Sequence, residues 1–250
     1  MNIVNILGIN ISIVNKEDVF GKVNEFLDSN KQHYIVTPNP EIILTSLKDE
    51  EYFYVLNKAD LAIPDGIGLK FAAWNFLVNI TRTTGADLTG WIIKLAEERK
   101  LKVGIVNFQG GLSNGDNIKN ILRKKYPNLQ LEIDDIDRDK RAEDCKNIIK
   151  LKPQILFVTL GAPYQEKFIF HNLSKFYSVR LAIGIGGSFD FLTGRIKRAP
   201  QIMRFFGVEW LWRIFQEPRG KKIWRLKRIF NAVIIFPIKF IIWRYFKKFL

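Results

Sequence analysis

The 250-residue chain holds 39 Lys and Arg against 25 Asp and Glu, and 47% of its residues are apolar. This apolar content is ample for the core of one α/β domain, with or without an appendage. A single cysteine, Cys145, excludes an internal disulfide framework and fits a reducing compartment. Residues 1–14 lack the basic start and cleavage site of a secretory signal, so we expect none.

The positive charge is concentrated near the C-terminus. Residues 197–250 hold 14 Lys and Arg but 2 Asp and Glu, a net charge of +12, which leaves +2 for residues 1–196. This division predicts a near-neutral α/β domain over residues 1–196 and a basic helical appendage over residues 197–250. It also indicates an anionic partner for the appendage, either a membrane surface or nucleic acid.

Short β-branched runs alternate with amphipathic helical patterns along most of the chain. Residues 3–14 are β-branched around Gly8, which predicts a small hairpin or a pair of edge strands. The alternation predicts a Rossmann-like α/β fold, in which helices flank a mostly parallel sheet. We expect helices at residues 16–29, 40–57, 69–76, 87–99, 117–125, 141–150 and 165–176, and strands at 34–36, 61–63, 102–106, 129–133, 155–160 and 181–185.

Two of the predicted strands end at prolines. Residues 34–36 run into a Thr-Pro-Asn-Pro sequence, and residues 61–63 run into Pro-Asp-Gly. Proline cannot donate to a sheet ladder, so each strand must stop there. Because strand ends of this kind line the ligand crevice of open parallel sheets, Thr37, Asn39 and Asp65 are candidate site residues. The alternative is that Asp65 belongs to a plain turn and Asn39 caps a helix.

Two further strand ends carry glycines and polar residues. The fifth predicted strand leads into Gly161 and Gln165, and the last leads into Gly186, Gly187 and Asp190. Glycines after a buried strand let backbone N–H groups approach a phosphate, although they serve equally for close packing. The G-x-G-x-x-G spacing is absent, so a nicotinamide-binding domain is disfavoured.

Seven short motifs share one order and a regular spacing along the chain. They are Thr37-Pro38-Asn39-Pro40-Glu41, Pro64-Asp65-Gly66-Ile67-Gly68, Arg82-x-x-Gly85-x-Asp87-Leu88, Gly161-Ala162-Pro163-x-Gln165-Glu166, Gly186-Gly187-x-Phe189-Asp190-x-x-x-Gly194, Arg198-Ala199-Pro200 and Glu209-Trp210-Leu211-x-Arg213. In this order, the chain closely resembles the WecG/TagA/CpsF family of bacterial glycosyltransferases. Residues 103–111 and 133–137 differ from the usual family pattern.

The resemblance implies a hexosyltransferase that moves a sugar from a UDP-sugar to a polyprenyl-diphosphate-linked sugar, with inversion at the anomeric carbon. The implied donor sugar is N-acetylmannosamine and the implied acceptor sugar is N-acetylglucosamine, in the synthesis of teichoic acid or a surface polysaccharide. N-Acetylmannosaminuronic acid and glucose are alternative donor sugars. Residues 1–196 would then be the catalytic domain, and residues 197–250 would associate with the inner face of the cell membrane. No nucleic acid partner is implied, and homo-oligomerisation stays open.

An inverting transfer needs a base for the acceptor hydroxyl and stabilisation for the departing UDP. Asp65, on a glycine-flanked loop, is the candidate base. Thr37 is assigned to the catalytic group beside it and, with Asn39, would hydrogen-bond the donor sugar or the acceptor. For each of these residues the alternative is a capping or loop role. The other substrate-binding candidates are Arg82 for the sugar or diphosphate, Gln165 and Asp190 for uridine and ribose, and Gly161, Gly186 and Gly187.

The charge on the leaving UDP has two candidate partners. Asp135-x-Asp137 fits the pattern that holds a divalent metal at a diphosphate, but its mixed acidic and basic surroundings favour a solvated loop. Arginine is the alternative, because it is permanently charged and bidentate toward phosphate oxygens. We expect no metal or other cofactor. We expect some of the arginines of the appendage to close over the site, from the set Arg213, Arg219, Arg225 and Arg228.

The appendage shows helical stripes of apolar residues. Its apolar run at residues 234–243 is interrupted by Pro237 and Lys239, and we expect it to be too short to span a bilayer. The pattern suits a helix that lies in the membrane interface, with Lys and Arg on anionic headgroups. Alternatively, the stripe packs on the body or on a second subunit. Interleaved aromatic and basic residues also occur on nucleic-acid surfaces, but the long aliphatic runs favour lipid.

Two other classes of protein stay open. One is a nucleotide-binding oxidoreductase, which bound NAD would reveal. The other is a non-catalytic module that binds a membrane or nucleic acid, whose function would survive the change Asp65→Ala.

Overall fold

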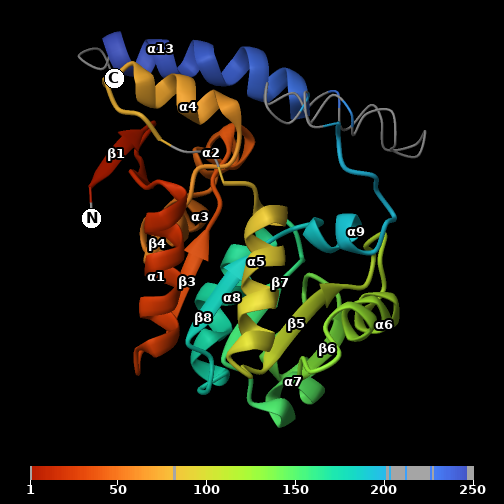
Figure 1. Cartoon of the computed structure of the whole chain (residues 1–250). Helices are drawn as coiled ribbons and strands as arrows, with labels where there is room; N and C mark the ends of the chain where they lie inside the picture. Colours follow the sequence, from red (N-terminus) through yellow and green to blue (C-terminus); the bar gives the residue numbers. More distant parts are fainter. Residues whose placement is uncertain are drawn as a thin grey trace.

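The computed structural model describes residues 2–80, 83–200, 203, 212, 226 and 228–246. Its central strands are β3 (His33–Val36), β4 (Leu61–Ala62), β5 (Val103–Phe108), β6 (Leu131–Ile136), β7 (Ile155–Val158) and β8 (Leu181–Gly184). They form one parallel six-stranded sheet in the order β4-β3-β8-β7-β5-β6 (Figure 1). The predicted Rossmann-like α/β fold is therefore confirmed.

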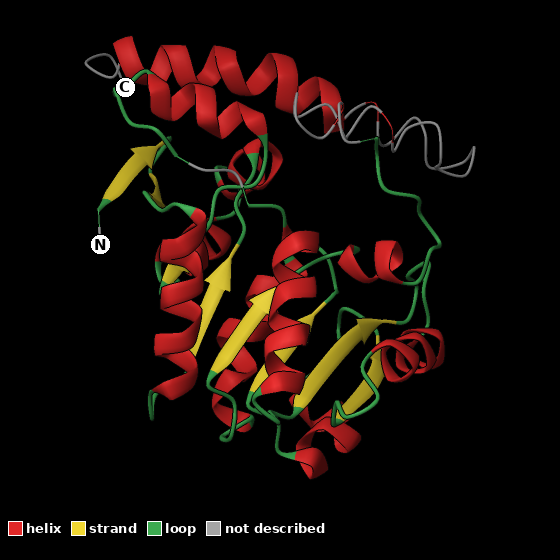
Figure 2. Cartoon of the chain, viewed as in Figure 1, coloured by secondary structure: helices red, strands yellow, loops and turns green. Residues whose placement is uncertain are grey.

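Helices cover both faces of the sheet (Figure 2). The helices of the main body are α1 (Lys16–Asp28), α2 (Pro40–Ser46), α3 (Glu50–Asn57), α4 (Ile67–Trp74), α5 (Gly85–Glu98), α6 (Gly115–Lys125), α7 (Lys146–Leu151), α8 (Tyr164–Asn172) and α9 (Ser188–Leu192), with 3-10 turns η1 (Ala142–Asp144) and η2 (Leu173–Lys175). The apolar sides of α1, α5 and α6 share one core with the sheet, and those of α2, α3, α7 and α8 share the other. The first of these cores includes Ile35 and Ile105, and the second includes their strand neighbours Val36 and Val106, as the alternation of side chains along a strand requires.

The chain leaves β5 and β7 in opposite directions. After β5 it passes through α6 to β6 at the edge, whereas after β7 it passes through α8 to β8 on the other side. The helices α6 and α8 accordingly belong to the two different cores. In open parallel sheets, a ligand crevice opens at the carboxyl ends of the strands at such a point. The ends of β5 and β7 are therefore one expected half of the site.

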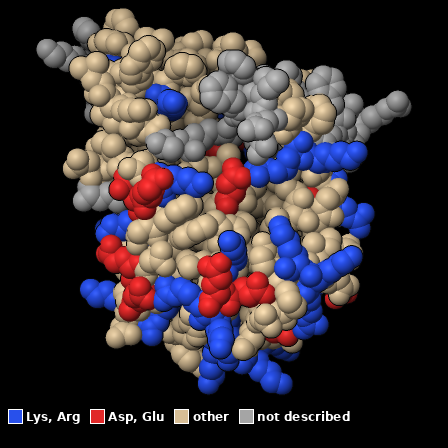
Figure 3. Space-filling view, viewed as in Figure 1, with Lys and Arg blue, Asp and Glu red and all other residues tan. Residues whose placement is uncertain are grey.

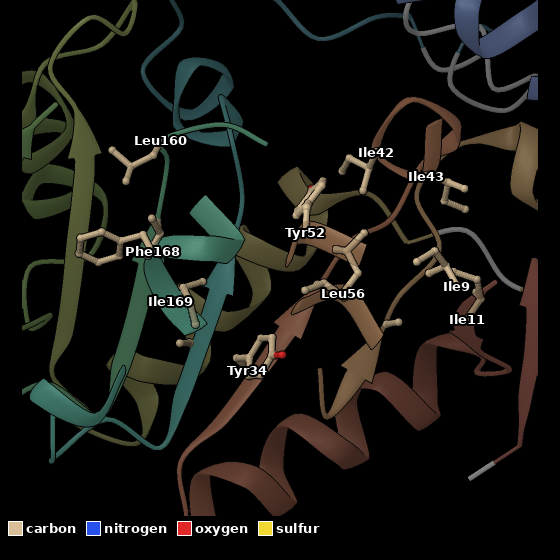
Figure 4. Close-up of a cluster of buried hydrophobic side chains, with 14 of the residues drawn as sticks. Ile9, Ile11, Tyr34, Ile42, Ile43, Tyr52, Leu56, Leu160, Phe168 and Ile169 are labelled. Atoms are coloured by element: carbon tan, nitrogen blue, oxygen red, sulfur yellow. The ribbon is translucent and has the colours of Figure 1, made fainter. Parts of the chain in front are cut away.

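The N-terminal residues form the predicted hairpin. The strands β1 (Ile3–Ile6) and β2 (Ile9–Ser12) pair antiparallel around a turn in which Gly8 has a φ of +86°. A side chain at Gly8 would also come within 2.7 Å of the Phe53 ring, so glycine is required twice over. Figure 4 shows Ile9 and Ile11 of this hairpin beside Ile43, in the core that continues to Tyr52.

Two predicted helix boundaries are wrong for local reasons. The single helix expected at residues 40–57 is two helices, because the Asp49 side chain accepts a hydrogen bond from the Tyr52 N–H (3.0 Å) and starts α3 anew. The cap of α5 is Thr84 rather than Asp87, whose carboxylate accepts a hydrogen bond from the Thr84 hydroxyl (2.6 Å). The short helix α9 was not predicted.

A long helix lies outside the sheet and packs along α4 (Figure 1). It comprises a π-helical turn, η4 (Asn231–Ile235), followed by α13 (Phe236–Phe246). The helix continues through Pro237, because the wider π-turn just before it accommodates a residue that lacks an N–H. The expectation that the apolar run is too short to span a bilayer is wrong for the length of this helix. The 19 residues Arg228–Phe246 form one helix that could cross a membrane by length and composition alone, and 11% of its most apolar window is buried.

Candidate active site

The carboxyl ends of β3 and β4 are joined by short backbone hydrogen bonds. The Ile63 N–H donates to the Val36 carbonyl (2.9 Å), and the Asp65 N–H donates to the Pro38 carbonyl (2.8 Å). The hydrogen bonds between the two segments thus continue past Val36 and Ala62, where β3 and β4 end. Asp65 therefore lies at the carboxyl end of the sheet. Thr37, the residue directly after β3, is 7% exposed.

Glycines after Asp65 allow close contact with the start of α2. Gly66 has a φ of +103°, and a methyl group there would lie 3.3 Å from the Pro40 ring. At Gly68 the same methyl would be 2.7 Å from that ring. Larger residues would therefore push the two strand-end loops apart and move Asp65.

Asn39 caps α2, as the alternative interpretation proposed. Its Oδ1 accepts a hydrogen bond from the Ile42 N–H (2.9 Å). The capping contact uses the oxygen and orients the side chain. The contact of the Asn39 Nδ2 group with a sugar stays a prediction.

The other half of the edge is a small hollow of about 40 Å³ at the ends of β5, β7 and β8. Its lining includes Gly186, Gly187 and Asp190, and it adds two residues that sequence reasoning missed, Asn107 and Thr159. The Thr159 hydroxyl donates to the Asn107 Oδ1 (2.9 Å) and accepts from a backbone N–H at the end of β5 (2.9 Å). These bonds fix the floor of the hollow.

Asp190 stands at the rim of the hollow on the first turn of α9. Its Oδ1 accepts a hydrogen bond from the Ser113 hydroxyl (2.7 Å), which also contacts the Thr193 hydroxyl (2.8 Å). A carboxylate held in this way suits hydroxyl donors such as those of a ribose. The predicted role of Asp190 thus has matching geometry, although its contact with a nucleotide stays a prediction.

Gln165 lies behind the glycine turn. It is 4% exposed, its Oε1 accepts from the Gly186 N–H (2.9 Å) and its Nε2 donates to Glu166 (2.7 Å). A methyl group at Gly184 would come within 2.8 Å of this amide. The Gly186 N–H is consequently not directed at a phosphate, and Gly184 serves close packing. Gln165 holds the turn in place, and its direct contact with uridine stays a prediction.

Glu166 is a buried carboxyl group that the sequence did not single out as a site residue. It is fully buried, and it accepts hydrogen bonds from the Tyr52 hydroxyl (3.1 Å) and from Gln165. Burial raises the pKa of Glu166 above its ordinary value of 4.5, while the hydrogen bonds from Gln165 and Tyr52 partly oppose the shift. Glu166 thereby connects α8 and the glycine turn to α3.

Glu166→Gln is expected to flatten the pH dependence of stability. The unfolded carboxyl ionises near pH 4.5, whereas the folded one keeps its proton to higher pH, so wild-type stability falls as the pH rises through this window. A glutamine cannot ionise and escapes this loss, which amounts to about 1.4 kcal/mol for each pH unit between the two pKa values. Urea unfolding of both proteins at pH 4 and pH 8 measures the difference. A difference between the proteins that does not change with pH would contradict the assignment.

The Asp135-x-Asp137 pair lies at the end of β6. The Asp135 carboxylate accepts hydrogen bonds from the Gly115 N–H (2.9 Å) and from Asn107 Nδ2 (2.6 Å), so it fixes the start of α6. Asp137 lies in the exposed turn after β6. Among the residues that the structure describes, no group of three or more acidic, His or Cys side chains could hold a metal.

Arg138, from the same charged run, is another residue that sequence reasoning missed. Its guanidinium packs on the rings of Phe108 (4.3 Å) and Tyr164 (4.8 Å), and its Nε donates to the Leu160 carbonyl (2.9 Å). Phe108 lines the hollow, and Gly161 faces the Arg138 terminal nitrogens. A fixed cation therefore stands beside the hollow, where the sequence had suggested a solvated loop.

The two halves of the site lie side by side along the carboxyl ends of the strands. Strand β3 separates β4 from β8, so the Asp65 and Gly186 backbones are about 10 Å apart by the usual strand spacing. Thr37 lies between them. A larger hollow of about 320 Å³, between α2 and η4, contains none of the predicted site residues. Arg82, Arg213, Arg219 and Arg225 fall outside the described residues.

Polar side chains gathered at the carboxyl ends of a parallel sheet, with a carboxylate after β4 and a small polar hollow at β5, β7 and β8, are the arrangement expected of an α/β enzyme. Residues 4–249 match the model of the Glycosyl transferase WecG/TagA/CpsF family, and the chain belongs to this family. The protein is a glycosyltransferase, as the resemblance implied.

Named relatives cover nearly the whole chain. The chain is 32% identical over 228 residues to the N-acetylglucosaminyldiphosphoundecaprenol N-acetyl-beta-D-mannosaminyltransferase of Bacillus subtilis strain 168. The aligned region covers 85% of this chain and 84% of that protein. It is 30% identical over 232 residues to a Staphylococcus aureus MRSA252 protein of the same name, with 90% and 89% covered. Both names describe a lipid-linked acceptor.

Proposed function

We propose that this protein transfers N-acetylmannosamine from its UDP derivative to N-acetylglucosamine on a polyprenyl diphosphate, with inversion, at the inner face of the cell membrane. The names of the relatives support the sugar and the acceptor. The observation that carries the proposal is the strand order β4-β3-β8, because Asp65 follows β4 and the turn that leads to Asp190 follows β8, two strand positions away. The UDP group would occupy the hollow at β5, β7 and β8, and its sugar would extend over Thr37 toward Asp65.

In the proposed reaction, Asp65 takes the proton of the acceptor hydroxyl. The acceptor oxygen forms a bond to the anomeric carbon as the bond from that carbon to the UDP oxygen breaks, and the electron pair leaves with the diphosphate. Attack from the face opposite the leaving group gives inversion. Thr37 would orient the reacting sugar. A positioned base of this kind contributes about 10²–10⁴-fold to the rate.

The departing diphosphate would be neutralised by arginines rather than by a metal. The engagement of Asp135 with the start of α6 supports this, because one carboxylate of the Asp135-x-Asp137 pair already accepts hydrogen bonds from protein donors. Arg213, Arg219 and Arg225 are the proposed source of charge. The predicted independence from metal follows from this proposal.

Arg138→Ala is expected to weaken the binding of UDP by about tenfold, because a charged hydrogen bond to phosphate would be lost. The planar face of the guanidinium packs on aromatic rings, so its edge is the part that can donate to phosphate oxygens. Calorimetric titration with UDP measures the change. The matched control is Lys140→Ala, which removes a charge from the same exposed loop. Unchanged UDP affinity in Arg138→Ala would remove this residue from the site.

The proposed function is tested by UDP release with a panel of UDP-sugars and a short-chain lipid-diphosphate N-acetylglucosamine acceptor. UDP-N-acetylmannosamine is the expected donor, and the panel includes UDP-N-acetylmannosaminuronic acid and UDP-glucose as the alternatives. Activity is expected to persist in excess EDTA. Preference for another donor would overturn the proposed sugar, and loss of activity in EDTA that Mg²⁺ restores would overturn the arginine mechanism.

A further inference from the structure

The helix that begins beside the catalytic loop exposes large apolar side chains. On α4 and the turn after it, Phe71 is 57% exposed, Trp74 70% and Leu77 93%. The opposite side of α4, with Leu69 and Ala73, is buried in the body. An exposed contiguous patch of this kind marks an interaction site on a soluble domain.

The helix α13 extends this patch. The Phe76 ring packs against Phe240 (6.1 Å) and Trp243 (6.3 Å), and Phe236 is buried under the start of α4. On its outer side α13 exposes Ile238 and Ile241, each 50%. Figure 1 shows α4 and α13 side by side at one end of the molecule, and Figure 3 shows that end mostly uncharged.

We propose that Phe71, Trp74, Leu77, Ile238, Ile241 and Ile242, here called the α4–α13 surface, dock together on an anionic lipid bilayer. The inference deepens the proposed function and rests on it, because it makes the catalytic body, and not the appendage alone, a membrane-binding element. Asp65 is two residues before the start of α4. The bilayer would thus hold the candidate base at the level where a lipid-linked acceptor presents its headgroup.

Charge favours a bilayer as the occupant over a second copy of the chain. Neither residues 67–78 nor residues 229–246 contain an Asp or Glu, whereas Lys70, Lys239 and Arg244 are exposed among the apolar residues. Two copies would bring these like charges together. Anionic headgroups instead attract cations at the rim of an inserted apolar face.

The attachment of the long helix favours an orientation in the plane of the membrane. At its start Arg228 forms an ion pair with Glu41, and near its end the Tyr245 hydroxyl contacts Asn75 (3.4 Å). Both ends are therefore tied to the body, on α2 and just after α4. A helix fixed in this way lies on the bilayer, although its length alone would allow it to cross.

The test is cosedimentation of the full-length protein with vesicles of phosphatidylcholine and phosphatidylglycerol. The double variant Trp74→Gln with Leu77→Asn is expected to bind about tenfold less tightly than wild type, because exposed apolar groups are lost from the interface. Asparagine tolerates the positive φ of +57° at position 77, so folding is expected to survive. The control is Tyr177→Gln, which removes a 66% exposed ring. Tyr177 precedes β8 and so lies at the amino ends of the strands, away from the α4–α13 surface.

Three outcomes decide the inference. Loss of vesicle binding in the double variant, with wild-type activity on a short-chain acceptor in solution, would support it. Unchanged vesicle binding would overturn it, as would a wild-type dimer that the double variant converts to a monomer in sedimentation velocity. The soluble-acceptor assay reports the proposed function separately, because it contains no bilayer.

Discussion

Replacing Asp65 with Asn is expected to lower the turnover number by about 10²–10⁴-fold, because an amide cannot take the proton of the acceptor hydroxyl. The substitution preserves size and shape. The backbone bond from residue 65 to the Pro38 carbonyl and the glycine contacts with Pro40 are independent of the side-chain charge. The loop is therefore expected to keep its conformation, and UDP is expected to bind with about unchanged affinity.

UDP release under saturating donor and acceptor measures the effect of Asp65→Asn, and calorimetry with UDP measures the binding. The matched control is Asp116→Asn, which removes one exposed carboxylate from the first turn of α6. The control is expected to keep full turnover. Turnover in Asp65→Asn within twofold of wild type would show that another group is the base, while equal loss in both variants would point to a general charge effect.

The strand-end half of the site was predictable from sequence because its signals are local. A proline after three apolar residues stops a strand wherever the chain later goes, so Thr37 and Asp65 could be assigned to the edge of the sheet. The sequences of the two strands do not specify that β3 and β4 are neighbours in the sheet. It follows from the order of the strands, which the sheet as a whole determines.

The residues that were missed depend on contacts between distant segments. Tyr52 and Glu166 are 114 positions apart in the sequence, and no local pattern around either residue predicts their contact. Arg138 sits in a run of charges that usually forms a solvated surface, and its fixed position comes from Phe108 and Tyr164 on other elements. Gln165 was recognised as a site residue, but the orientation of its amide toward Gly186 depends on the close approach of α8 to β8.

Two described residues, Arg198 and Arg228, contact helices that begin near the loop of Asp65. Arg198 forms an ion pair with Asp87 (2.6 Å) at the start of α5, and the Thr83 N–H just before α5 donates to the Pro64 carbonyl (3.4 Å). Arg228 forms an ion pair with Glu41 at the start of α2. Arg213, Arg219 and Arg225 lie between these two residues in the sequence, which supports their proposed role at the diphosphate.

Arg213→Ala and Arg219→Ala are each expected to lower turnover by about 10²-fold, because a cation that stabilises the leaving diphosphate acts mainly in the transition state. Thermal unfolding is expected to change little. The Arg→Lys variants are expected to recover part of the rate, since lysine supplies the charge without the bidentate geometry. UDP release with the short-chain acceptor in solution measures these rates without a contribution from membrane binding.

The control for the tail arginines is Lys239→Ala, an exposed cation on α13 that the same assay is not expected to detect. A loss of rate in Lys239→Ala as large as in the arginine variants would indicate that net charge, and not position, determines the effect. Full turnover in both Arg213→Ala and Arg219→Ala would remove the appendage from the chemistry. Arg82, which precedes α5 in the sequence, would then be the next arginine to change.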